Sequence, residues 1–257
     1  MARGTAHCQG DIARMTSPSP SSTPAAPAAH AADVAPVDPP GHGMLLAFTG
    51  GFVDTLGFVA LFGLFTAHVT GNFVLIGAAM AGDGHADVVG KLLALPTFVI
   101  GVAATRLFQL RRERQGRDTA APLVAIQLAG LVAFMFAGVG VGPFAHGGGM
   151  HAIGVGLMGV LAMSVQNTAA RSVFSRLTPS TVMTGNVTQL VMDLVDIATR
   201  APGMAAAGAR LHKAWPPVAT FAAGSLAGGL GYAHAGFWAL LAPCIALAVL
   251  LRLLRKH

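Results

Sequence analysis

Charged side chains are scarce in this sequence. Only 10% of its 257 residues are charged and 54% are hydrophobic, whereas about a quarter of the residues in a typical soluble domain are charged. The 52 residues from Thr119 to Ala170 and the 38 from Ala214 to Leu251 carry no charge, and Asp54 is the one charge between Met44 and Ala81. A membrane span needs about 20 apolar residues. The sequence therefore excludes a soluble globular enzyme and predicts an all-α polytopic membrane protein.

Cysteine is also scarce, which limits the chemistry that the chain can perform. Cys8 near the N-terminus and Cys244 in an apolar segment are the two cysteines, and they give neither a disulfide framework nor a pair of metal ligands. The ten histidines show no metal-ligand spacing, and no Ser-His-Asp or Cys-His arrangement can be argued. We therefore expect no catalytic residue, no metal and no cofactor, and do not expect an enzyme.

The apolar segments indicate six full spans and two shorter pieces. The expected spans are Met44–Phe65, Gly90–Leu107, Pro122–Phe144, Ala152–Ala170, Pro216–Tyr232 and Gly236–Leu254. The pieces Asn72–Ala81 and Asn186–Ile197 are too short to cross alone, so each is a half-helix, a re-entrant segment or the continuation of a bent helix. Residues 1–43 hold seven of the fifteen prolines and are predicted to form a disordered tail without a signal peptide, followed by a transmembrane domain over 44–257.

The loop charges predict the orientation in the membrane. Basic residues concentrate in cytoplasmic loops, and four arginines follow the second span: Arg111, Arg112, Arg114 and Arg117. The loop Ala145–His151 has no Lys or Arg and is therefore predicted to be external. Both termini then lie on the cytoplasmic side of the membrane. The cytoplasmic position of the basic loops accounts for the net charge of +6, so we expect no nucleic-acid partner. The expected partners are the lipid bilayer and an unknown small solute or ion, and a homo-oligomer is compatible with the sequence.

The chain contains an internal repeat. Thr70-Gly71-Asn72 and Thr184-Gly185-Asn186 lie 114 residues apart, and each opens one of the short apolar pieces. Asp54-Thr55 and Asn167-Thr168 precede them at similar distances. We therefore predict two repeats, at about 44–144 and 152–254. Each has three full spans, so the second must be inverted relative to the first, as the loop charges independently require.

These motifs also resemble a known family. The matching segments are Gly51-Phe52-Val53-Asp54, His68-Val69-Thr70-Gly71-Asn72, Gln166-Asn167 and Met183-Thr184-Gly185-Asn186. They resemble the bacterial membrane family that carries the domain-of-unknown-function label DUF1275, also called YoaK-like. The resemblance runs from about Met44 to Arg255. It implies an integral inner-membrane protein of roughly this size and brings no established activity with it.

Asp54 is the residue that most needs an explanation. It lies near the middle of the first expected span, where an ionised carboxylate costs at least about 2.5 kcal/mol. It is either a proton- or cation-coupling group facing a central cavity, with His68 as a second titrating group, or a neutral structural partner of a neighbouring helix. Its repeat mate Asn167 keeps the shape and loses the charge, and Gln166 beside it belongs to the same motif.

The Thr-Gly-Asn motifs have two readings. Glycine permits a sharp turn and leaves free N–H groups at a new helix N-terminus, so two such ends entering from opposite faces would bind an anion or a polar group at the midplane. Alternatively, Thr70 and Thr184 simply cap ordinary helices. Beyond the second motif, Gln189, Asp193 and Asp196 share one helical face. This face is either a cytoplasmic vestibule or ion pathway or, in the interpretation we prefer, the solvated side of an interfacial helix.

The sequence thus predicts a small-solute transporter or channel with a midplane polar site between inverted repeats. The alternative is a non-transporting membrane scaffold or sensor whose polar core residues only specify packing. The candidate ligand-binding residues are Asp54, His68, Thr70, Gly71, Asn72, Gln166, Asn167, Thr184, Gly185 and Asn186.

Overall fold

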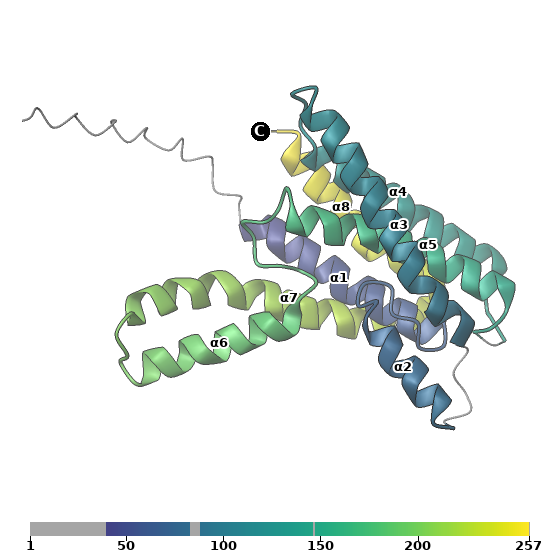
Figure 1. Ribbon diagram of the computed structural model, residues 1–257, viewed down its shortest axis with the longest axis horizontal. Coiled ribbons are helices and arrows are strands. Elements are labelled where there is room, and N and C mark those ends of the chain that lie inside the picture. Colours follow the sequence, from purple (N-terminus) through teal and green to yellow (C-terminus); the bar gives the residue numbers. More distant parts are fainter. Residues whose placement is uncertain (1–39, 83–87, 146, 257) are drawn as a thin grey trace, which may run out of the picture. The chain divides into compact units, whose positions relative to one another are not determined.

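The computed structural model describes residues 40–82, 88–145 and 147–256, and these residues form helices and loops without a strand (Figure 1). The helices are α1 (Pro40–Ala60), α2 (Gly71–Met80), α3 (Val88–Glu113), α4 (Ala120–Val141), α5 (Met150–Arg171), α6 (Met183–Ala198), α7 (Met204–Ala235), the short 3-10 helix η1 (Gly236–Leu240) and α8 (Leu241–Leu254). The first helix begins at Pro40 rather than at Met44. The rest of the predicted tail lies outside the described residues.

Five described segments are long and apolar enough to cross a membrane: Gly41–Ala60, Val88–Glu113, Ala120–Val141, Met150–Arg171 and Met204–Leu254. The last has 51 residues, about 77 Å at 1.5 Å per residue, and its regular helix is interrupted at Gly236, where φ is +57°. It therefore contains both the fifth and the sixth expected spans. The chain is an all-α polytopic membrane protein.

The central helices are α1 and α5. Within their apolar windows 67% and 72% of the residues are buried, against 28–39% in the other candidate spans. The other spans expose large apolar side chains such as Ile100 and Leu226, which suits contact with lipid. The first span ends at Ala60 instead of Phe65, because Phe62 and Gly63 adopt positive φ angles and turn the chain.

Two parallel helix pairs organise the described bundle. In the α1–α7 pair, side-chain carbons placed on Gly224 and Gly228 would overlap the carbonyl groups of Phe48 and Phe52, so the glycines let the two backbones approach closely. In the α3–α5 pair, Gly101 faces Ser164. Residue numbers increase together along both pairs, which makes each pair parallel.

The two short helices each pack against a longer helix. The 10-residue α2 contacts α3, and the 16-residue α6 contacts α7, lying along its first part in Figure 1. Both are too short to cross a membrane alone, as predicted. The solvated interpretation of the α6 polar face is wrong for Asp193, which is fully buried. Its Oδ1 accepts hydrogen bonds from Arg210 Nη2 at 2.6 Å and from Gln189 Nε2 at 3.0 Å.

Candidate functional site

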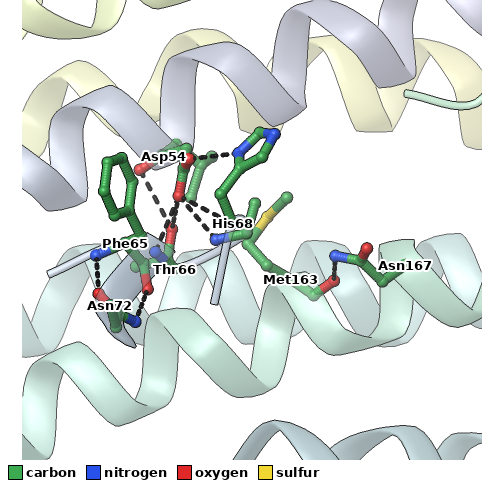
Figure 2. Close-up of polar contacts among 9 residues, drawn as sticks. Asp54, Phe65, Thr66, His68, Asn72, Met163 and Asn167 are labelled. Atoms are coloured by element: carbon green, nitrogen blue, oxygen red, sulfur yellow. Dashed lines mark hydrogen bonds and ion pairs between the residues drawn. The ribbon is translucent and has the colours of Figure 1, made fainter. Parts of the chain in front are cut away.

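Asp54 holds the loop that joins α1 to α2. Asp54 is 5% exposed. Its Oδ1 accepts hydrogen bonds from the backbone N–H groups of Thr66 at 2.8 Å, Ala67 at 2.7 Å and His68 at 3.4 Å (Figure 2). Three N–H donors compensate a carboxylate for lost hydration. The loop thus satisfies the intramembrane charge that the sequence left without a partner.

His68 takes the second oxygen of this carboxylate. Its Nδ1 lies 2.6 Å from Asp54 Oδ2, and its side chain is 34% exposed, whereas that of Asp54 is 7% exposed. The hydrogen bond to Asp54 raises the pKa of His68 above its ordinary value, although burial opposes the shift. The ring also makes an edge contact with Phe221 of α7. The structure therefore unites these two predicted residues in a pair whose histidine is partly exposed and whose carboxylate is buried.

Asn72 and Asn186 each hold a loop by donating the side-chain amide to a backbone carbonyl seven residues earlier, an arrangement that we call the asparagine clip. Asn72 is 1% exposed; its Oδ1 accepts from the Phe65 N–H at 2.9 Å and its Nδ2 donates to the Phe65 carbonyl at 3.0 Å (Figure 2). Asn186 Nδ2 donates to the Pro179 carbonyl at 2.7 Å. In both cases the partner lies seven residues earlier. Proline has no N–H, so the second clip has one backbone hydrogen bond where the first has two.

The expectation of free amides at the start of α2 is wrong. The N–H groups of Gly71, Asn72 and Phe73 donate to the carbonyls three residues earlier, at 2.8, 3.1 and 3.2 Å. Thr70 makes no side-chain capping bond to the described residues of α2, so the capping alternative also fails there. A side chain at Gly71 would press on the Phe65 ring, which explains the glycine sterically.

The second motif is placed differently from the first. Thr184 and Gly185 lie inside α6, which begins at Met183, and both are exposed. Thr184 is therefore not the capping residue of that helix, whose N-cap position is Val182. The two Thr-Gly-Asn motifs share the asparagine clip rather than an anion-binding helix end.

Gln166 connects three segments in the core. It is fully buried; its Nε2 donates to the Leu46 carbonyl of α1 at 2.8 Å and to Ser180 Oγ at 3.1 Å, and its Oε1 accepts from Gln127 Nε2 of α4 at 2.6 Å. Ser180 lies 114 residues after Thr66, the loop residue that Asp54 holds. Gln166 therefore performs in the second half the loop-holding role that Asp54 performs in the first.

Asn167 lies apart from this network. Its Nδ2 donates to the Met163 carbonyl of its own helix at 3.1 Å (Figure 2). It lines an open cleft of about 860 Å³ between α3 and α5, together with Phe98, Val102, Arg106, Gln109, Glu113, Thr168, Arg171, Ser172 and Val173. No sequence motif pointed to this cleft. Extending the second span from Leu107 to Glu113 would have placed Gln109 in a helix, where a polar residue needs a partner.

Comparison with known proteins identifies the family of the chain. The family described as "Protein of unknown function (DUF1275)" matches residues 42–253. The UPF0700 transmembrane protein YoaK of Bacillus subtilis (strain 168) is 33% identical over 150 residues, which are 58% of this chain and 64% of that relative. The matched part therefore spans less than two thirds of the relative's length. No solved structure matches the chain.

Proposed function

The chain belongs to the family DUF1275, whose function is unknown, and we propose that it is not an enzyme but transports or conducts a small solute or ion across the bacterial plasma membrane. Both termini lie on the cytoplasmic side in this proposal. The observation that carries it is the way in which the two halves of the chain contact each other, since internal inverted repeats are typical of secondary transporters.

The helix contacts support inverted repeats. In the proposed repeat, α1, α2, α3 and α4 correspond to α5, α6, α7 and α8. Under this correspondence each contact has a counterpart: α1–α7 matches α5–α3, α2–α3 matches α6–α7, and α4–α5 matches α8–α1. The α4–α8 and α1–α5 contacts convert into themselves. The paired clips of Asn72 and Asn186 follow the same exchange. With three spans in each half, the second half is inverted.

The two equivalent interfaces differ in a way that supports alternating access. Gly224 and Gly228 close the α1–α7 interface, whereas the α3–α5 interface contains the cleft of about 860 Å³. One closed and one open interface is the arrangement expected when related halves exchange conformations around a fixed site. His68 contacts Phe221 at the closed interface, so the Asp54–His68 pair is the proposed proton- or cation-coupling group.

Cysteine labelling tests whether water reaches these positions. In a chain with Cys8 and Cys244 replaced, we expect a membrane-impermeant thiol reagent to label His68→Cys and Asn167→Cys from one side of the membrane each, with Asn167→Cys labelled from the cytoplasmic side. Leu131→Cys is the matched control, because Leu131 is fully buried in α4, and should not react. If neither test position reacts from either side, the proposal of an aqueous path is wrong.

The alternative, a scaffold or sensor whose polar core is structural, is favoured by one observation. Asp54 Oδ1 already receives three backbone hydrogen bonds, which is what a purely structural carboxylate would do. His68→Gln separates the two functions, because it leaves these bonds in place and removes only the titrating ring. A coupled transporter should show pH-dependent labelling at Asn167→Cys and should lose that pH dependence when His68→Gln is added, whereas a scaffold shows no pH dependence to lose.

A further inference from the structure

The cleft between α3 and α5 lies at the C-terminal ends of two parallel helices. Its volume of about 860 Å³ falls within the range of small-molecule sites, roughly 300–1,000 Å³. Phe98 and Val102 form an apolar wall along α3, while arginine, glutamate and amide side chains occupy the end nearer the helix termini. The cleft therefore offers an apolar surface and a polar end to one ligand.

The charges in the cleft leave one guanidinium available. Arg106 Nη1 lies 3.1 Å from Glu113 Oε1, so these two residues neutralise each other. Arg171, exposed in the last turn of α5, takes part in no ion pair with the described residues. A guanidinium is suited to binding a carboxylate or phosphate through two parallel hydrogen bonds. The cleft thus has a position for an anionic group.

Two amide oxygens provide the opposite chemistry. Gln109 is fully buried; its Nε2 donates to Ser172 Oγ at 2.6 Å, and Ser172 Oγ donates to the Thr168 carbonyl at 2.7 Å. This chain fixes the orientation of the amide, and Gln109 Oε1 has no hydrogen-bond partner among the residues that the structure describes. Asn167 donates its N–H to Met163, which leaves its Oδ1 as a second acceptor. Helix C-termini also favour a cation, so the complementary group is an ammonium.

We infer that this cleft binds a zwitterion with an apolar substituent. The anionic group binds Arg171, the ammonium donates to Gln109 Oε1 and Asn167 Oδ1, and the apolar part lies against Phe98 and Val102. An apolar α-amino acid has this chemistry, and so does the headgroup and chain region of phosphatidylethanolamine. The identification of this ligand as a transported substrate rests on the proposed function, but its binding is measured without transport.

A matched set of probes tests the inference on the purified full chain in detergent. L-leucine carries both charged groups, 4-methylpentanoate lacks the ammonium, and isopentylamine lacks the carboxylate. We expect L-leucine to raise the melting temperature and to bind at least about tenfold more tightly than either analogue, since each lost charge-assisted hydrogen bond costs about a factor of ten or more in affinity. Equal binding of the three probes would overturn the inference.

Reconstitution distinguishes the two sources of the ligand. Phosphatidylcholine has no N–H on its ammonium, so nanodiscs of phosphatidylethanolamine should stabilise the protein more than nanodiscs of phosphatidylcholine if the site holds a headgroup. Stabilisation by this lipid without an effect of L-leucine identifies a lipid site with the same chemistry. The absence of both effects overturns the inference.

Variants locate the binding in the cleft. Arg171→Gln and Gln109→Leu should each weaken binding of the active probe at least about tenfold, and Arg171→Lys should restore part of it. Arg111→Gln is the matched control, because Arg111 is exposed on α3 and does not line the cleft. Unchanged binding in both test variants overturns the inference. If the wild-type chain binds none of the probes but cysteines at positions 68 and 167 are labelled as expected, the inference about the ligand is wrong and the proposed transport function stands.

Discussion

The asparagine clip of the first half provides a sharp test of the structure. Asn72→Ala removes two hydrogen bonds with Phe65, of 2.9 and 3.0 Å, at a residue that is 1% exposed. Two net hydrogen bonds contribute about 1–3 kcal/mol, and the groups of Phe65 that are left unpaired add about 1 kcal/mol, the low end for a buried group, because Phe65 is partly exposed. We therefore expect the variant to lose about 2–4 kcal/mol of unfolding free energy.

The second half contains the matched comparison. Asn186 makes a single backbone hydrogen bond, to the Pro179 carbonyl at 2.7 Å, and it is partly exposed. Asn186→Ala should therefore cost about 1–2 kcal/mol. The difference between the variants therefore reports the bond that Phe65 can form and Pro179 cannot, together with the deeper burial of Asn72.

Denaturant titration in detergent, followed by fluorescence, measures both free energies. Thr70→Ala is the control, because Thr70 is exposed beside the first clip and makes no side-chain capping bond to the described residues of α2. It should change stability by less than about 0.5 kcal/mol. If Asn72→Ala is no more destabilising than Thr70→Ala, the clip does not hold the loop and the description of the site is wrong.

Three further predictions concern other parts of the molecule. The bond with Asp54 raises the pKa of His68 above 6.5. The pair therefore stabilises the fold fully below about pH 6.5, and this stabilisation is lost as the pH rises through the raised pKa. Melting temperatures between about pH 5 and pH 9 should fall accordingly, and His68→Gln should abolish this pH dependence. Gly224→Ala should cost about 1–3 kcal/mol by overpacking α1 against α7, whereas Gly140→Ala, with no atom within 4 Å of the new carbon, should be neutral or stabilising by about 0.5–1 kcal/mol; thermal unfolding of both variants checks the contrast. Arg210→Gln removes the guanidinium that binds the buried carboxylate of α6, so limited trypsin digestion should cleave the α6–α7 connection faster than in the wild type, and an unchanged rate would contradict that contact.

Hydropathy predicts the helices because it measures the property that membrane insertion selects. It misplaces helix ends where backbone geometry decides. The first span stops at Ala60 because Phe62 turns the chain with a positive φ, a feature that hydropathy does not register. The α7 helix begins at Met204 instead of Pro216. Hydropathy places the start too late because Arg210 lowers the local hydropathy, whereas in the fold Asp193 of α6 binds this arginine.

The candidate site was predicted where residues repeat and missed where residues meet only in three dimensions. Asn72 and Asn186 were identified by their common motif, and they have a common geometry, although the motif holds a loop instead of presenting helix dipoles. Gln109 lies in α3 and Ser172 directly follows the end of α5, 63 residues away. No local pattern links such a pair, so the cleft that they border becomes visible only in the fold.

The two halves of the chain use side chains of different charge to hold the equivalent loop. Asp54 binds the loop containing Thr66, and Gln166 binds Ser180 at the equivalent place. An amide binds no proton at accessible pH, whereas the carboxylate of Asp54 is paired with His68, whose imidazole can bind one. In the proposed transport mechanism, proton binding at this pair therefore acts on the loop of the first half. His68 also contacts Phe221 of α7 at the closed α1–α7 interface, which joins the two halves. In the proposed duplicated arrangement, protonation of His68 therefore gives the loop that Asp54 holds a pH response that the loop held by Gln166 lacks.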